Sequence, residues 1–214
     1  MPARAVAFDF NGTLSQDEPI LCAVYRDLFA EEGRPLSEED YYGALAGHSE
    51  ETIIGTWLGV DGDELARLVE ERIERYLALV GRGESVPDGV REAVAYAAER
   101  VPVAVVSGAF RREIEPVLAG ADLRRHVTVV VAADDVERGK PAPDGYLQAV
   151  GLLGDGLRPG DVVAFEDTEA GVASAKAAGL ACVGVLGTHP PERLAAADEL
   201  VDALSVEIVR RLVA

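Results

Sequence analysis

The chain has 214 residues, of which 49% are hydrophobic and 27% charged, and its formal net charge at pH 7 is −18. This length suits one large domain or a core with a small insert, and the composition is that of a globular protein rather than a disordered one. The negative charge argues against nucleic acid and anionic membranes as partners, because both would repel the protein.

The sequence shows no apolar run long enough to span a bilayer, and no apolar signal segment before its first strand. We therefore expect a cytoplasmic protein. Cys22 and Cys182 lie in apolar surroundings and lack the spacing of metal ligands. We expect two buried thiols in preference to a disulfide.

The first predicted element is a short buried strand over residues 5–8, an uninterrupted apolar run. Helical spacing follows from about residue 17 to residue 80. Ser37 and Ser49 are plausible helix starts, and residues 61–80 predict a long amphipathic helix. The glycine-containing segment 81–87 breaks the helical pattern and is typical of a linker.

Beyond residue 87, apolar runs alternate with helical stretches. Strands are predicted over residues 101–106, 127–132, 162–165 and 181–186. This alternation predicts βαβ units and a doubly wound parallel sheet, an α/β fold that the strand at residues 5–8 completes. The preceding helices are then an insert into one α/β domain. We expect residues 1–15 and 86–214 to form the core domain, and residues 16–85 to form the helical insert.

Polar side chains follow several of these strands. Asp9 and Asn11 come directly after the first strand, where open α/β sheets bind ligands. Taken alone, Asp9 could simply cap a helix or form a turn, and Asn11 suits a turn equally well.

Three further sites stand at a strand end or in the loop that follows one. Ser107 and Gly108 precede a helix, so Ser107 is either a helix N-cap or part of a phosphate-binding corner. Lys140 lies between prolines that stiffen its loop, and is either a solvated lysine or a cation for a phosphoryl group. Glu166 and Asp167 either cap the next helix or bind Mg²⁺ through oxygen.

These four sites resemble, in order, the four motifs of the haloacid dehalogenase superfamily. The segments that carry the resemblance are Asp9-Phe10-Asn11-Gly12-Thr13-Leu14, Ser107-Gly108, Lys140-Pro141-Ala142-Pro143-Asp144 and Glu166-Asp167-Thr168-Glu169-Ala170-Gly171. The insert after the first motif is similar to the helical cap of the branch that contains β-phosphoglucomutase and phosphoglycolate phosphatase. The resemblance implies a Rossmann-like core with a cap, and a phosphatase that acts on a small phosphorylated metabolite.

The resemblance also implies a role for each matching residue. Asp9 would attack phosphorus and form an aspartyl-phosphate. Mg²⁺ would be held by Asp9, the backbone carbonyl of Asn11 and Asp167, with Glu166 binding it directly or through water. Ser107 and Lys140 would bind the phosphoryl group. Apart from the resemblance, we also expect Thr13, Gly108 and His48 among the substrate-binding residues.

Asn11 departs from the family pattern, which has a general acid/base aspartate at this position. An amide cannot supply a proton as a carboxyl group does, and such help is worth about 10²–10⁴ in rate. Four interpretations stay open: a substrate with a good leaving group, a proton from another group such as His48, a deliberate Asp-to-Asn substitution that traps a complex, or phosphate binding with little turnover. Asn11-Gly12 is also a dipeptide prone to deamidation.

A β-phosphoglucomutase-like phosphotransferase is the alternative activity. That branch carries an arginine in a Gly-x-Ser-Arg segment, whereas this chain has Gly47-His48-Ser49-Glu50, and no lysine or arginine occurs between residues 35 and 66. A bisphosphorylated intermediate would need a cationic clamp there. His48 is either idle in solvent or held charged near neutral pH by Glu50. Hinges for the cap are expected near Ser15 and residues 81–86.

Overall fold

The computed structural model describes residues 2–154 and 156–213. A wholly parallel six-stranded sheet lies at its centre, with the strand order β3-β2-β1-β4-β5-β6. The strands are β1 (Ala5–Phe8), β2 (Val103–Val106), β3 (Val129–Val131), β4 (Val162–Glu166), β5 (Ala181–Val185) and β6 (Glu199–Val201). The order reverses between β1 and β4, which confirms the doubly wound fold and places a topological switch point beside β1. β6 is absent from the sequence-based prediction, because its three residues give no extended apolar run.

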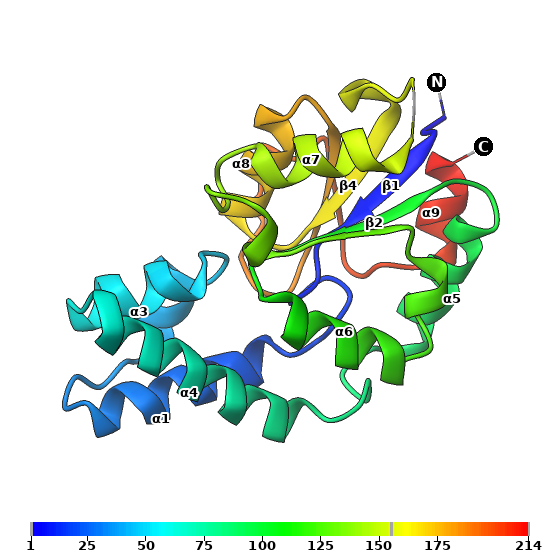
Figure 1. Ribbon diagram of the computed structural model, residues 1–214. Helices are drawn as coiled ribbons and strands as arrows, with labels where there is room; N and C mark the ends of the chain where they lie inside the picture. The colour runs from blue at the N-terminus through cyan, green and yellow to red at the C-terminus, as the bar shows by residue number, and fades with distance from the viewer. Residues whose placement is uncertain (1, 155, 214) are drawn as a thin grey trace.

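Helices cover both faces of the sheet (Figure 1). Val6 and Phe8 of β1 pack in the core layer that includes α5 and α9, whereas Ala5 and Ala7 face the layer of α7 and α8. This alternation follows from the two-residue period of a strand. The helices are α5 (Asp88–Ala98), α6 (Arg111–Gly120), α7 (Asp144–Leu153), α8 (Glu169–Ala177) and α9 (Val206–Leu212), with short 3-10 turns at Arg124–His126, Ala133–Asp135 and Pro159–Asp161.

The segment between β1 and α5 forms a helical insert that lies apart from the sheet in Figure 1. Its elements are α1 (Glu18–Glu31), α2 (Glu38–Asp40), a π-helical turn (Tyr41–Leu45), α3 (Glu50–Leu58) and α4 (Gly62–Val80). The Ser37 and Ser49 side chains accept hydrogen bonds from backbone N–H groups of the first helical turns, as predicted. Gly33 and Gly59, both at φ +74°, interrupt the helical pattern.

Two chain segments connect the insert to the sheet, and they are hydrogen-bonded to each other. The side-chain oxygens of Ser15 and Ser85 lie 2.7 Å apart, and Gln16 N donates to Ser85 O at 2.8 Å. Cys22 and Cys182 are buried free thiols, as expected. Each helix in the described part of the chain is too short or too polar to cross a membrane.

Candidate active site

The site lies at the carboxyl ends of three adjacent strands. Asp9 directly follows β1, Ser107 directly follows β2, and Glu166 is the last residue of β4. Phe8 pairs with Phe165, so the chain positions after them bring Asp9 and Glu166 together. Parallel strands that start in register end at one edge of the sheet, which is why residues far apart in sequence meet here.

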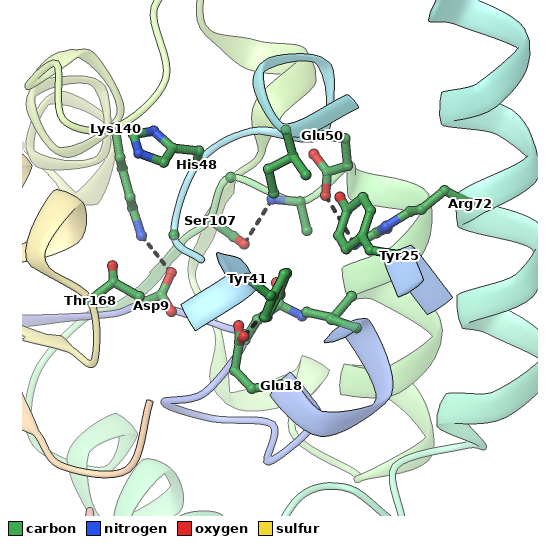
Figure 2. Close-up of a pocket in the computed structure, with 16 residues that line it drawn as sticks. Asp9, Glu18, Tyr25, Tyr41, His48, Glu50, Arg72, Ser107, Lys140 and Thr168 are labelled. Carbon is green, nitrogen blue, oxygen red and sulfur yellow. Dashed lines mark hydrogen bonds and ion pairs between the residues drawn. The ribbon is translucent and has the colours of Figure 1, made fainter. Parts of the chain in front are cut away.

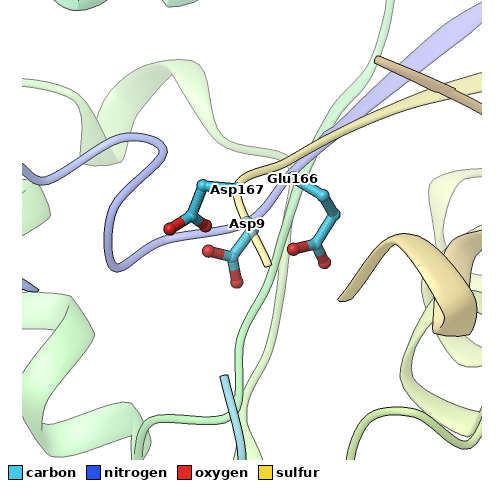
Figure 3. A group of neighbouring side chains, drawn as sticks. All are labelled: Asp9, Glu166 and Asp167. Carbon is cyan, nitrogen blue, oxygen red and sulfur yellow. The ribbon is translucent and has the colours of Figure 1, made fainter. Parts of the chain in front are cut away.

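Three carboxylates form a buried cluster at this edge (Figure 3). Asp9, Glu166 and Asp167 each offer an oxygen, and these atoms lie within 4.8 Å of one another. The backbone passes very close to two of the carboxylates. A Cβ on Gly12 would lie 1.9 Å from Asp167 Oδ2, and one on Gly171 would lie 1.8 Å from Glu166 Oε2. Glycine is therefore required at both positions.

Lys140 is the cation that faces this cluster. Its Nζ lies 2.5 Å from Asp9 Oδ1 and 2.7 Å from Glu166 Oε1, and Tyr146 also donates to Glu166 Oε1 at 2.5 Å. Burial raises the pKa of Glu166 to about 7 against the opposing effect of Lys140. Burial alone would lower the pKa of Lys140, but Asp9 and Glu166 outweigh it and raise that pKa above its ordinary value.

The cluster has the composition of a site for a hard divalent cation. Burial, followed by the charge of Asp9, raises the pKa of Asp167 well above its ordinary value. Among the described residues, Glu166 Oε2 and Asp167 Oδ2 are buried without a hydrogen-bond partner. Three carboxylates outnumber the single ammonium group of Lys140, and carboxylate oxygens are the ligands that Mg²⁺ prefers. These residues therefore fit Mg²⁺.

The loop after β1 turns at Gly12, whose φ is +77°. Thr13 Oγ1 donates to Asp167 Oδ1 at 3.2 Å, so the Thr13 side chain supports a carboxylate of the cluster. The Asn11 amide donates through Nδ2 to Asp17 Oδ2 at 3.0 Å, and Tyr76 donates to the same oxygen at 2.5 Å. Burial raises the pKa of Asp17 to about 6.

Ser107 occupies the corner that precedes α6. Its Oγ accepts a hydrogen bond from Ala109 N at 3.1 Å, whereas the N-cap of α6 is Phe110. The interpretation of Ser107 as a helix N-cap is therefore wrong, because the helix begins three residues later than that role requires. Within residues 2–154 and 156–213 the Ser107 hydroxyl donates no hydrogen bond, so its hydrogen can be donated to a ligand. On the other side of the site, the Lys140–Pro141 peptide bond is cis.

A cavity of about 40 Å³ lies where the insert meets this edge of the sheet (Figure 2). Six of the residues predicted from the sequence line it, namely Asp9, Asn11, His48, Ser107, Gly108 and Lys140. Thr13, Glu166 and Asp167 lie outside this lining and next to it. The structure thus brings the four motifs and the insert to one place.

The insert also contributes lining residues that are not among the binding residues expected from the sequence. They are Glu18, Leu21, Tyr25, Tyr41, Gly47, Glu50, Ile53 and Arg72. Arg72 is the notable one, because it supplies the insert side of the cavity with a cation from outside residues 35–66, which contain no lysine or arginine. Arg72 could have been noticed in the sequence, because it is a charged residue between Val69 and Ile73 on the apolar face of α4.

Arg72 is buried between acidic and aromatic side chains of the insert and the core. Its guanidinium pairs with Glu113 of α6 and lies 3.3 Å from Glu50 Oε1 of α3. Its centre also lies 5.3 Å from the Tyr25 ring centroid and 5.2 Å from that of Tyr76. Glu50 therefore has Arg72 as its ion-pair partner, and no salt bridge joins Glu50 to His48 among the described residues.

Glu18 and Glu50 are the further carboxyl groups of the cavity. Glu18 Oε2 accepts a hydrogen bond from Tyr41 at 3.0 Å. Burial and the neighbouring Asp17 raise the pKa of Glu18 to about 8. Burial likewise raises the pKa of Glu50 to about 8, although Arg72 opposes the shift. The side of the cavity formed by the insert is thus polar and largely shielded from solvent.

Comparison with known proteins identifies relatives over nearly the whole chain. The family model for haloacid dehalogenase-like hydrolases matches residues 3–179. Validoxylamine A 7'-phosphate phosphatase of Streptomyces hygroscopicus subsp. limoneus is 32% identical, with 94% of each chain covered. Protein CbbY of Rhodobacter capsulatus is 33% identical, with 86% of this chain and 85% of the relative covered.

A solved structure agrees with the sequence relatives. It is an aspartate-to-asparagine mutant of CbbY from Rhodobacter sphaeroides, in complex with xylulose-(1,5)bisphosphate. It is 28% identical and superposes with a TM-score of 0.86, covering 99% of this chain and all of its own. This relative therefore has the same architecture, a core with a helical insert.

Proposed function

The chain belongs to the haloacid dehalogenase-like hydrolase family, and from this premise we propose that it is a Mg²⁺-dependent phosphatase for a small phosphorylated metabolite. The observation that carries the proposal is the placement of Asp9. This carboxylate lies at the sheet's switch point, is paired with Lys140, and lines the same cavity as Ser107. Relatives named as phosphatases support the same activity.

Asp9 is the proposed nucleophile. Its carboxylate oxygen forms a bond to phosphorus while the bond from phosphorus to the ester oxygen breaks, which gives an aspartyl-phosphate and an alcohol or alkoxide. Water then attacks the phosphorus and releases inorganic phosphate and free Asp9. Covalent catalysis of this kind divides one difficult displacement into two easier ones.

The other core residues bind the phosphoryl group and hold the metal ion. Lys140, the Ser107 hydroxyl and the backbone N–H of Gly108 would face the phosphoryl oxygens, where their positive charge and dipoles stabilise developing negative charge. Asp9, Asp167 and the backbone carbonyl of Asn11 would hold Mg²⁺, with Glu166 binding directly or through water. When bound, the ion neutralises charge on the phosphoryl oxygens.

Asn11 determines which esters react. Because its amide cannot protonate an alkoxide, esters with good leaving groups should react and simple alkyl esters should react slowly. His48 lines the cavity from the insert and is the candidate for an alternative proton donor. The competing function is phosphate binding with little turnover, which the hydrogen bond between Asn11 and Asp17 favours because it occupies the amide at the catalytic position.

We further propose that residues 16–85 act as a mobile cap on a core formed by residues 1–15 and 86–214. A single buried water needs about 10–15 Å³, so a cavity of about 40 Å³ holds a few waters but no sugar phosphate. Substrate must therefore be admitted by movement of the cap, and closure then excludes water. The paired segments at Ser15 and Ser85 are the proposed hinges. A cytoplasmic location stays a prediction.

The test is phosphate release with Mg²⁺ from alkyl, aryl and acyl phosphates, with a chelator-treated sample as control. The proposal predicts release that requires Mg²⁺ and favours acyl and aryl phosphates. If the protein binds Mg²⁺ and inorganic phosphate but releases phosphate from none of these esters, the proposed phosphatase activity is overturned. The competing function, phosphate binding with little turnover, would then be favoured.

A further inference from the structure

Three polar atoms at the insert side of the cavity have no hydrogen-bond partner among the described residues. They are Tyr25 Oη, Glu50 Oε2 and Arg72 Nε. Their side chains come from α1, α3 and α4, all line the cavity, and all are at least nine-tenths buried. Figure 2 shows the three side chains close together, on the opposite side of Ser107 from Lys140.

Such atoms indicate a polar ligand. Leaving a buried donor or acceptor unpaired is unfavourable, and an apolar ligand would leave all three unpaired. A hydroxyl group suits the set, since it can accept from Arg72 Nε–H and donate to a carboxyl oxygen of Glu50. Tyr25 Oη can donate or accept. A carbon chain with several hydroxyl groups would satisfy all three atoms.

The charges in the cavity disfavour a second phosphate. Arg72 already pairs with Glu113, which is itself fully buried, and with Glu50. Lys140 already pairs with Asp9 and Glu166 at the other end. A second phosphate would bring further negative charge to a guanidinium that already pairs with the buried Glu113 and Glu50, and the lining supplies no further arginine or lysine to compensate its desolvation.

We propose that Tyr25, Glu50 and Arg72 form a subsite for hydroxyl groups of the leaving group, so that the preferred ligand is a polyhydroxylated monophosphate rather than a bisphosphate. The inference rests on the proposed function for the orientation of the ligand, with its phosphate at Asp9. It assigns specificity to residues of the insert that lie outside the four motifs.

Three probes of equal carbon number test the subsite: xylitol 5-phosphate, n-pentyl phosphate and xylitol 1,5-bisphosphate. Calorimetric titration with Mg²⁺ compares the chain with Tyr25→Phe, which removes only the unpaired hydroxyl. Tyr96→Phe on α5, away from the cavity, is the matched control. We expect xylitol 5-phosphate to bind most tightly, and Tyr25→Phe to weaken it about fivefold to tenfold while leaving n-pentyl phosphate unchanged.

Glu50→Gln, which keeps the shape of the side chain, supplies a second variant with the same expected selectivity. The proposal is overturned if the bisphosphate binds best, or if Tyr25→Phe and Glu50→Gln weaken xylitol 5-phosphate and n-pentyl phosphate equally. Turnover measured in an Asn11→Asp background separates the two claims. Selective binding without turnover would contradict only the proposed phosphatase activity. Turnover without selectivity would contradict only the proposed hydroxyl subsite.

Discussion

Asn11 Nδ2 donates a hydrogen bond to Asp17 Oδ2 at 3.0 Å, which ties the position of the missing general acid to the first residue before α1. Tyr76 of α4 donates to the same oxygen at 2.5 Å. Residue 11 is thus connected to two helices of the insert. Because burial already raises the pKa of Asp17 to about 6, a carboxyl group at position 11 would share a proton with it.

Asn11→Asp should therefore produce a proton donor in the place where one is needed. We expect kcat/KM for alkyl phosphates to rise by about 10²–10⁴, and kcat/KM for acyl phosphates to change little, because a good leaving group needs no proton when the aspartyl-phosphate forms. Steady-state phosphate release measures both. Asn11→Ala is the control, since it removes the amide without adding an acid. Equal acceleration by both variants would contradict the account, and the intact mass of the parent checks for deamidation at Asn11.

Asp9→Asn should abolish phosphate release while the fold persists. The substitution keeps the shape of the side chain but removes the proposed nucleophile, and Lys140 retains Glu166 as a partner. Circular dichroism monitors folding, and phosphate release from an acyl phosphate monitors activity. Retention of parental turnover by the folded variant would show that another group attacks phosphorus.

Mg²⁺ should stabilise the protein through the three carboxylates. Binding at 100 times the dissociation constant adds about 2.7 kcal/mol to the free energy of unfolding. We expect a higher melting temperature with Mg²⁺, and loss of most of this shift in Asp167→Asn. Asp198→Asn is the matched control, because Asp198 pairs with Lys176 outside the cluster. A Mg²⁺ shift that survives in Asp167→Asn would place the ion elsewhere.

The buried acids of the cavity predict how stability depends on pH. Glu18 and Glu50 have pKa values raised to about 8, above their ordinary value of 4.5. Between those values the folded state binds more protons than the unfolded state, so stability falls as pH rises. Without Mg²⁺, the free energy of unfolding should decrease from about pH 5 to pH 8.5, as urea denaturation would measure.

Glu50→Gln should flatten this decrease in part, because it removes one of the buried acids whose pKa is raised. Glu51→Gln is its exposed neighbour and should leave the slope unchanged. A steep decline that persists equally in both variants would assign the pH dependence to other groups.

The core of the site could be predicted because strand ends determine it. Asp9, Ser107 and Glu166 each follow an apolar run, and a parallel sheet brings such positions to one edge. The insert side could not be predicted in the same way. Tyr25 and Arg72 meet only through the packing of α1 against α4, which depends on helix rotation and on loops that a single sequence does not define. The position of Arg72 among the apolar residues Val69 and Ile73 is nevertheless visible in the sequence.

The most direct test of the central claim is detection of a phosphoryl group on Asp9. The chain is mixed with acetyl phosphate and Mg²⁺, quenched in acid, digested and analysed by mass spectrometry. We predict phosphorylation of the peptide that contains Asp9. It should accumulate because Asn11 does not activate the hydrolytic water, and Asp9→Asn should abolish it. Steady turnover of acetyl phosphate with an unmodified Asp9 peptide, undiminished by Asp9→Asn, would contradict the account.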